Sequence, residues 1–527
     1  MTTAAALTHP QDRIDQLMDR GSDLFNPILV KEVRQALKSR QFIITFLLLL
    51  GSAWIVTVGG LAWIGPMVEY TPAGYRFFMG YYFVLCVAAH IIVPIAAYRS
   101  LLAERDFNTF DLLSITLLKP RQMVWGKLLG ALLQVLMFFS AIAPFVAFTS
   151  LMDGFDLPRA LLLMGGTLCL SLGSSMLGLM LATVTRQRHL QGIVSMMFLG
   201  GLVSGFFTFQ AAVVGENAVG QIDFDGDFWR VLGTSLLIGL SYVLLFQEVA
   251  VSQLTFESDN RSSGVRIIAT VQYLGWLIGF PLAARHFTNG AMLADPVVSV
   301  YCVGAALHWT ALGLSFVVEP DPLSRRLKRR LPLNAFVRLL IAPWLPGGSR
   351  GFLLLLVQLM LLQYAIGFLI WGLGWIPAAE ARRTLLLSFG CAGYVLFYLG
   401  LGSAIGRLFS SILTPPHVRV VTLLLFAFGV VTPYFPMLLM DRPLQTYQLT
   451  YALNPMETLS EVYDHGTSNE VAAALFLLLI AVSLIVAWQA RYVVNGLVEV
   501  WSPRIPPELH GDPPAERTAP GRVGAEA

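Results

Sequence analysis

The chain has 527 residues, of which 56% are hydrophobic and only 13% are charged. An average soluble domain carries about 25% charged residues, so this chain has too little charge to cover a water-soluble globule of its size. A mean hydropathy of +0.68 excludes a secreted domain, a cytosolic enzyme and a disordered scaffold. The net charge of +3 is small and dispersed, so we expect no nucleic-acid partner. The bulk of the chain is expected to lie in a membrane.

Apolar stretches of the length that crosses a hydrocarbon core, about 20 residues, occur along the whole chain. They lie at 42–64, 77–98, 128–152, 160–184, 190–215, 229–251, 266–284, 296–317, 351–376, 384–405, 418–438 and 470–489. None shows the period-2 alternation of a membrane β-barrel. The sequence therefore predicts an all-α fold, a polytopic integral membrane helix bundle with about 12 transmembrane helices. Pro433 and Pro436 interrupt the eleventh stretch near its end.

The cationic residues fall mainly in alternate loops. With the N-terminus placed in the cytoplasm, 28 of the 35 Lys and Arg residues lie inside, and those outside are Arg76, Arg159, Arg230, Arg285, Arg382, Arg383 and Arg442. Because cytoplasmic loops are enriched in Lys and Arg, this asymmetry predicts a multi-pass protein of a bacterial-type inner membrane with both termini cytoplasmic. The external loops are too short to fold as a substrate-capturing domain, so function is expected in the bundle and in the cytoplasmic segments.

The predicted spans divide the chain into four parts. Residues 1–41 form a cytoplasmic N-terminus, 42–255 a six-span unit, 256–500 a second six-span region, and 501–527 a polar cytoplasmic tail that we expect to be disordered. The four cysteines lie in apolar stretches without CxxC spacing, which predicts buried small side chains and no metal site. The motif HExxH is absent, and His residues and carboxylates do not pair on a common face of the predicted spans, so no catalytic residues are assigned.

Residues 26–40 directly precede the first span and have the pattern of an amphipathic helix. Pro27 suits a first helical position after a capping Asn26. Apolar residues share one stripe, and the opposite face carries the charged residues Lys31, Glu32, Arg34 and Lys38. This pattern predicts an interfacial helix on the inner leaflet, with its cations toward lipid headgroups. An ordinary basic anchor before a membrane span is the alternative.

The segment Arg99–Lys127, between the second and third predicted spans, has a distinctive charge pattern. Its charged residues Glu104, Arg105, Asp106 and Asp111 precede a short apolar run, and Pro120 then breaks the chain. Most loops have about 4–6 residues, so a segment of this length is more than a connector. A helical turn with charges at one end and leucines at the other suits docking on a protein groove.

These residues resemble the ABC transporter permeases of the type-2 exporter class. The matching positions are Glu104-Arg105, Thr109, Asp111-Leu112-Leu113, Pro120 and Gly126-Lys127, against a family motif E-R-E-x-G-T-x-E-x-L followed by Pro and by Gly-Lys or Ala-Lys. The NPxxxKExR stretch at 26–34 is similar to the connecting helix before the first span of that family. The resemblance covers roughly residues 26–260, and it departs from the family at Asn108, where Gly is usual, and at Asp106, where the family has Glu.

The resemblance implies that 42–255 is the permease unit of an ATP-driven exporter. In that family the permease is not itself an enzyme and binds no cofactor, because ATP is used by a separate ABC ATPase subunit that docks on cytoplasmic helices. The sequence agrees in lacking a GxxxxGK[ST] phosphate loop. The ATPase-docking residues implied are Glu104, Arg105, Thr109, Asp111 and Pro120. The alternative is that they only cap the loop and pair with one another.

The second half of the chain matches that family less well. Its segment 318–350 lacks the Glu-Arg…Thr pattern but carries five cations within Arg325–Arg330, which we expect to hold anionic membrane lipid. Residues 256–266 form a polar turn that is either a connector or a second docking site. Whether this half is a diverged second permease unit, and whether a second copy of the permease is a partner, stays open.

An ion-coupled secondary transporter and a non-transporting membrane assembly protein are the competing functional classes. Twelve spans with cytoplasmic termini are also common among secondary carriers. A proton relay needs carboxylates within the membrane, and no predicted span has Asp or Glu at its centre. His90 and Gln134 are the main polar candidates within the spans, and hydrogen bonding between helices is the expected role of both. The cargo and the direction of transport do not follow from the sequence.

Overall fold

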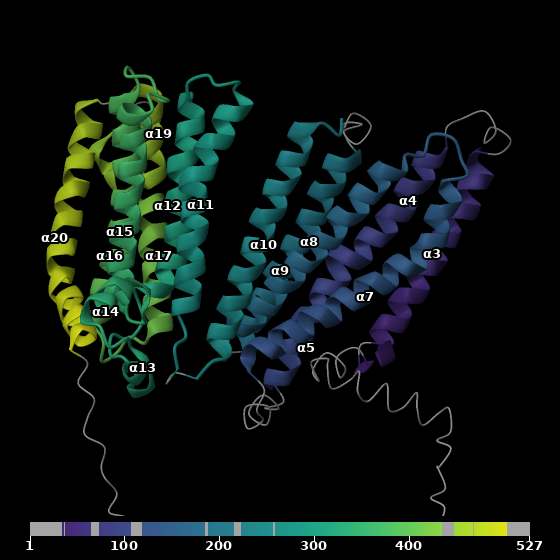
Figure 1. Ribbon diagram of the computed structural model, residues 1–527, viewed down its shortest axis with the longest axis horizontal. Helices are drawn as coiled ribbons and strands as arrows, with labels where there is room; N and C mark the ends of the chain where they lie inside the picture. Colours follow the sequence, from purple (N-terminus) through teal and green to yellow (C-terminus); the bar gives the residue numbers. More distant parts are fainter. Residues whose placement is uncertain are drawn as a thin grey trace, which may run out of the picture. The chain divides into compact units, whose positions relative to one another are not determined.

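The computed structural model describes residues 34–35, 37–64, 73–106, 119–184, 188–214, 223–256, 259–434, 447–466 and 468–502. These residues form helices and connecting turns without a single strand, as Figure 1 shows. Eleven of the described helices are long and apolar enough to cross a membrane. The predicted all-α, polytopic membrane bundle is thus confirmed.

The chain divides into two compact units at the junction of Thr255 and Phe256, the position at which the sequence separates the two six-span regions. The first unit contains one helix for each of its six predicted spans, and the second span is continuous through a π-helical turn, η2. In chain order its helices are α3 (Arg40–Ile64), α4 (Gly74–Val87), η2 (Ala88–Ile92), α5 (Val93–Asp106), α7 (Pro120–Thr149), α8 (Leu157–Val184), α9 (Arg188–Val214) and α10 (Gly226–Leu254).

The second unit also has six long helices, and short helices lie between some of them. The long ones are α11 (Ser263–Phe287), α12 (Asp295–Phe316), α15 (Gly348–Gly367) with the π-helical turn η5 (Phe368–Gly372), α16 (Ala381–Leu408), α17 (Pro415–Val431) and α20 (Asn469–Trp501). The short ones are α13 (Arg325–Arg330), α14 (Ala335–Ile341), η4 (Ala342–Trp344), η6 (Thr432–Tyr434), η7 (Leu449–Leu453) and α19 (Pro455–His465).

The predicted span 418–438 corresponds to α17, which is shorter than the other long helices. It has 17 residues, so at 1.5 Å per residue it is about 25 Å long, close to the minimum for a membrane span. Pro415 stands at its start, where the missing amide hydrogen costs nothing. The described chain therefore holds eleven clear spans and one borderline span.

The loop predicted at Arg99–Lys127 is shorter than expected. Helix α5 continues through Asp106, and α7 begins at Pro120, so both ends of the predicted loop are helical and only residues 107–119 separate the two helices. The physical reason is that a helix does not end where hydrophobicity ends, because its charged residues can extend beyond the hydrocarbon while its backbone hydrogen bonds continue. Helix α20 likewise continues to Trp501, beyond the predicted end at 489.

The outer faces of both units carry many exposed apolar side chains. Ile55, Leu237, Ile278, Leu307 and Leu484 are each more than 60% exposed, although they lie in the middle of long helices. A water-soluble protein rarely exposes apolar surface on this scale, whereas such side chains are stable against lipid tails. Polar residues stand at helix ends instead: Asp225 and Ser468 accept hydrogen bonds from the first turns of α10 and α20.

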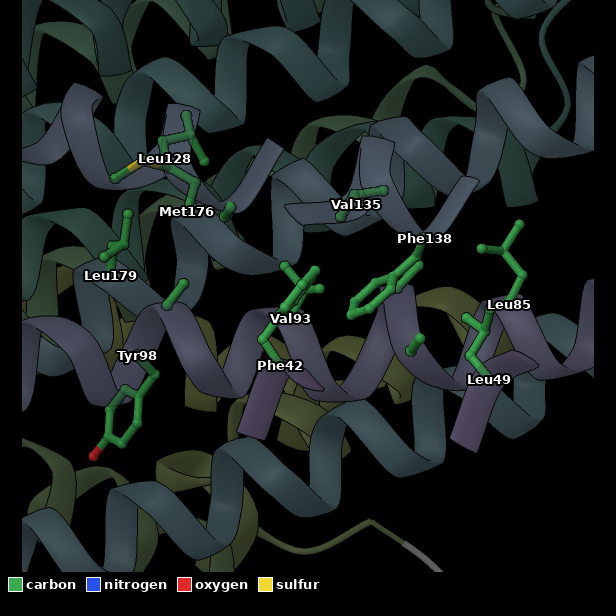
Figure 2. Packing of buried hydrophobic residues seen from close by; sticks show 14 of the residues in the cluster. Phe42, Leu49, Leu85, Val93, Tyr98, Leu128, Val135, Phe138, Met176 and Leu179 are labelled. Carbon is green, nitrogen blue, oxygen red and sulfur yellow. The ribbon is translucent and has the colours of Figure 1, made fainter. Parts of the chain in front are cut away.

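The inner face of the first unit is a core of interdigitated aromatic and aliphatic side chains, shown in Figure 2. Phe42 of α3 stacks on Phe138 of α7 with ring centroids 5.5 Å apart. Val93 and Tyr98 of α5 are fully or almost fully buried in the same cluster, with Leu179 of α8. With Phe198 of α9 and Ala250 of α10 also buried in it, this core joins all six spans of the first unit.

The two units use the same order of neighbours. In the first unit the fourth span, α8, packs against the second span through α5 and against the sixth span, α10. In the second unit the fourth span, α16, packs against the second span, α12, and the sixth span, α20. The third spans, α7 and α15, also contact the fourth and sixth spans of their own units. Each unit is thus organised around its fourth span.

Close backbone approach occurs where α15 starts beside the end of α12. A Cβ atom added to Gly351 would lie 2.5 Å from the carbonyl oxygen of Phe316 and 2.8 Å from its carbonyl carbon. Gly347, just before α15, has φ +131°, a conformation that residues with a side chain rarely adopt. These glycines let α15 begin in contact with the segment that follows α12.

We predict that Gly351→Ala destabilises the protein by about 1–3 kcal/mol, because the added methyl group would overlap backbone atoms that cannot rotate away. Gly279→Ala is the matched control, since a Cβ on Gly279 in α11 would meet no atom within 4 Å and alanine favours a helix. Thermal unfolding in detergent measures both variants. Equal melting temperatures would contradict the close approach.

Candidate functional site

A buried ion pair joins the two helix ends that flank residues 107–119. Lys127, near the start of α7, has a side chain only 1% exposed, and its Nζ lies 3.2 Å from Oε2 of Glu104 in α5. Nζ also lies 3.4 Å from Oγ and 3.5 Å from the carbonyl oxygen of Ser100. An ammonium group removed from water needs such acceptors. The pair therefore fixes α5 to α7 at the base of the predicted docking segment.

The other predicted docking residues are only partly placed. Arg105 belongs to α5, but its side chain lies outside the described part of the chain, as do residues Thr109 and Asp111 altogether. Pro120 is the first residue of α7, where its fixed φ suits helix initiation. Of the five residues, the structure thus gives Glu104 a charged partner and gives Pro120 a helix-starting role.

The predicted interfacial helix is described only at its C-terminal end. Arg34 and Lys38 are helical and exposed, whereas Lys31 and Glu32 lie outside the described residues. The helical conformation is interrupted at Ser39, whose Oγ accepts a hydrogen bond from the Phe42 amide at 3.1 Å. This cap separates the preceding helical residues from α3.

A second ion pair connects α7 to the last span of the first unit. Arg121, in the first turn of α7, donates to the carboxylate of Glu248 in α10. The Glu248 side chain is 12% exposed, and that of Arg121 is 60% exposed. The beginning of α7 is therefore tied to α5 on one side and to α10 on the other.

In the second unit the corresponding end contains a fully buried arginine, Arg266 of α11. Its guanidinium donates to Oε2 of Glu319 at 2.7 Å and to the carbonyl oxygens of Gly347 at 3.0 Å and Pro343 at 3.1 Å, and also to that of Leu345. The planar five-donor geometry of arginine suits several acceptors at once. Arg266 thereby fastens the whole segment between α12 and α15 to the start of α11.

A second fully buried arginine, Arg350 in the first turn of α15, binds the end of α20. Its Nη1 lies 3.4 Å from Oε2 of Glu499 and 3.3 Å from the Gly496 carbonyl oxygen. Glu499 also accepts from Nζ of Lys328 in α13 at 2.9 Å and from the Leu323 amide at 3.1 Å. A single carboxylate thus connects the third span, the sixth span and the short helix α13.

Each unit contains an ion pair of the same kind, which the sequence analysis did not predict. An arginine in the first turn of the third span pairs with a glutamate toward the end of the sixth span, Arg121 with Glu248 and Arg350 with Glu499. The partners are 127 and 149 residues apart along the chain. No local motif reveals such pairs, and the only signal was a charge placed where a span meets the interface.

The opposite end of the second unit is acidic. Arg383, in the first turn of α16, donates to Oδ2 of Asp295 at 2.6 Å, and Glu380 precedes α16 beside the same carboxylate. Partial burial raises the pKa of Glu380, and the neighbouring Asp295 raises it further, while Arg383 opposes the change. Two carboxylates therefore share one cation here.

Within the described spans, His90 and His308 lie toward mid-span, whereas the carboxylates lie near the span ends. Nε2 of His308 in α12 lies 3.0 Å from the Ala269 carbonyl oxygen of α11, and His90 packs edge-on against Phe209. Every described carboxylate within a span is within two turns of a helix end, namely Glu104, Asp227, Glu248, Asp295, Glu470 and Glu499. Among the described residues, none of these carboxylates lies at mid-span, whereas His90 lies in η2 near the middle of its span and its Nε2 has no hydrogen-bond partner.

Comparison of the chain with family models, with curated proteins and with solved structures finds no match in any of the three. The resemblance to exporter permeases therefore depends on the motif residues themselves. The protein is a membrane-embedded helical bundle of two similarly packed units, with ion pairs concentrated where the spans end.

We predict that Arg266→Lys destabilises the protein by about 2–3 kcal/mol. Lysine keeps the charge but cannot reach the carboxylate and the backbone carbonyl groups together, so buried acceptors lose their donors. The control is Arg285→Lys in the same helix, because Arg285 is partly exposed and stacks on Trp375 at 4.8 Å; we expect a loss below about 1 kcal/mol. Thermal melting compares them, and similar losses would refute the anchoring role.

We predict that Glu380→Gln melts at a higher temperature than the wild type at pH 7.5. Because its pKa is raised in the folded state, Glu380 contributes stability that is gained as pH falls toward the ordinary value of 4.5 and lost at higher pH. The difference between variant and wild type should therefore shrink at pH 5. Glu470→Gln, in the first turn of α20 at the same end, is the control and should give no stabilisation.

Proposed function

We propose that this chain is the membrane-spanning permease subunit of an ATP-driven exporter of the ABC type, energised by a separate ATPase subunit. The observation that carries the proposal is the buried pair of Lys127 and Glu104. A simple connector needs no such anchor, whereas a segment that transmits force must be joined firmly to the helices it moves. The pair joins α5 and α7, the helices that precede and follow the proposed docking segment.

Displacement of residues 107–118 would pass through this joint to α5 and α7. From α7 it would reach α10 through Arg121 and Glu248, and from α5 it would reach the central span α8, against which α5 packs. A displacement of the docking segment would thus move α5, α7, α8 and α10 together. Such a coupling of docked helices to the spans is what alternating access requires.

The second unit supports a tandem arrangement within one chain. Its spans repeat the neighbour order of the first unit, and the pair of Arg350 and Glu499 repeats the link from third to sixth span. We propose that residues 256–500 are a diverged second permease unit. The chain would then supply both membrane halves of the exporter, and a second copy would not be needed to complete it.

An ion-coupled secondary transporter is the less favoured class. Proton coupling uses carboxylates or histidine relays within the membrane, and the described carboxylates of the spans are near helix ends. A membrane assembly protein without transport would also explain the fold. It would have no need of an ATPase partner, so partner binding separates it from the exporter.

We predict that the full-length chain co-purifies with an ATPase encoded next to it, and that Thr109→Ala together with Asp111→Ala lowers the recovered ATPase at least tenfold. Both positions match the family motif and lie in the docking segment. Asp223→Ala is the control, because Asp223 is exposed and lies three residues before α10, at the other end of the unit. Quantitative mass spectrometry of the purified complex measures the ratio of the two subunits.

The same measurement tests the tandem arrangement. Two ATPase molecules per chain are expected for two permease units, and one per chain would show that only one unit docks an ATPase. Failure of every neighbouring ATPase to co-purify would contradict the exporter proposal as a whole. Equal recovery with the double variant and the control would contradict the role of the docking segment.

A further inference from the structure

The second span of the first unit is locally unwound at its middle by the π-helical turn η2. Within this turn the Val93 amide donates to the Ala88 carbonyl oxygen. The next residue, Pro94, has no amide hydrogen, so the Ala89 carbonyl oxygen loses the donor that would continue the pattern. Oγ of Ser171 in α8 donates to that oxygen instead, at 2.6 Å. Single π-turns inside α-helices are frequent at functional sites, and this one exposes backbone to the polar side chains of a neighbouring span.

A row of polar side chains runs along the contact between this span and α8. The hydroxyl of Tyr82 lies 2.7 Å from Oγ1 of Thr167, and Sγ of Cys86 lies 3.7 Å from the same atom. Residues four apart share one face of a helix. Polar residues recur at this spacing in both elements, as Tyr82, Cys86 and His90 in the second span and as Thr167, Ser171 and Ser175 in α8.

The row ends in buried polar atoms that have no partner among the residues that the structure describes. These atoms are Nε2 of His90, Oγ of Ser175 and Oε1 of Gln210 in α9. The side chains of His90 and Gln210 are each 7% exposed, and that of Ser175 is fully buried. His90 packs edge-on against Phe209, which precedes Gln210 in the same turn of α9. Buried polar atoms nearly always have a partner, so these three retain hydrogen-bonding capacity for a bound molecule.

Helix α9 covers this region only loosely and borders the lipid-facing surface. It is the least buried of the eleven described spans, with 11% of its most apolar stretch buried. A Cβ atom on Gly201 or Gly205 would meet no atom within 4 Å. Phe206 is buried and contacts Phe83 of α4 and its neighbour Phe207, which are 45% and 61% exposed. An aromatic surface therefore leads from the buried polar row to the position of the lipid chains.

The electrostatics of this region favour an uncharged occupant. Among the described residues of the first unit, charged side chains of the spans lie within about two turns of the helix ends. A charged headgroup at η2 would therefore lose its water without gaining a counter-ion, which is costly. The Gln210 oxygen can only accept a hydrogen bond, whereas a histidine nitrogen donates or accepts according to its tautomer. A hydroxyl group both donates and accepts, so it matches either case.

We infer that His90, Ser175 and Gln210 mark a lateral binding site, here named the η2 site, for an uncharged amphiphile with a hydroxyl-bearing head, such as a monoacylglycerol. The hydroxyl groups bond to the unpartnered atoms of the site. The acyl chain lies along the phenylalanines of α9 and reaches the surrounding lipid. That this molecule is the cargo rests on the proposed exporter function, whereas its binding does not.

The test labels the full-length protein in nanodiscs with a monoacylglycerol that carries a photoreactive diazirine on its chain, and locates the adducts by mass spectrometry. We expect saturable labelling of α9 and α4. Monooleoylglycerol should compete with it, whereas methyl oleate, which has no hydroxyl group, and oleyl sulfate, which is charged, should not. His90→Phe and Gln210→Met should each lower the competable labelling about fivefold, because one buried hydrogen bond is lost.

His308→Phe in the second unit is the matched control, because Nε2 of His308 already lies 3.0 Å from the Ala269 carbonyl oxygen. It should lower the melting temperature and leave the labelling unchanged. His90→Phe should leave the melting temperature of the unliganded protein unchanged or raise it, since it removes an unpartnered polar atom.

Three results would overturn the inference. They are equal competition by methyl oleate, adducts spread evenly over all lipid-facing helices, and a lower melting temperature of His90→Phe with unchanged labelling. The assay contains no ATPase, so its failure would leave the exporter proposal standing. Failure of an ATPase to co-purify would likewise leave the η2 site standing.

Discussion

The hydrocarbon of a bilayer offers no hydrogen-bond partner, and the rest of this structure follows from that constraint. Backbone polar groups must be satisfied within each segment, so the chain crosses the membrane as helices. Charged side chains are expelled toward helix ends, and those that remain buried there must find acceptors within the protein. The joints of Lys127, Arg266 and Arg350 are the result. They concentrate the specific polar interactions of the molecule at the ends of its spans.

The two units place their buried and half-buried charges in related positions. Both connect the third span to the sixth by an arginine and a glutamate, yet the side chain of Arg121 is 60% exposed and that of Arg350 is fully buried. The difference arises because the second unit has α13, α14 and η4 between its second and third spans, and these elements cover the arginines. The first unit instead buries the cation Lys127 beside Glu104.

Buried ion pairs are not in themselves a source of large net stability. Removing a guanidinium from water costs several kcal/mol, which the pairing and the hydrogen bonds offset. Their consequence is geometric, because an arginine with four or five acceptors has only one arrangement of its neighbours that satisfies it. Arg266 therefore determines where the chain between Pro343 and Gly347 lies, and apolar packing on its own would permit that chain to slide.

The length and apolar content of the segments determined the fold class, the positions of the spans and the boundary between the units, because a helix must cover a fixed membrane thickness. The charge pattern and Pro120 also indicated the segment after the second span. The tertiary structure decided which charges meet: Glu104 and Lys127 come from two different helices, α5 and α7, and Arg350 and Glu499 lie 149 residues apart along the chain. It also decided that the segment 318–350 contains the short helices α13, α14 and η4. Local sequence cannot specify such pairs, since they depend on which spans become neighbours.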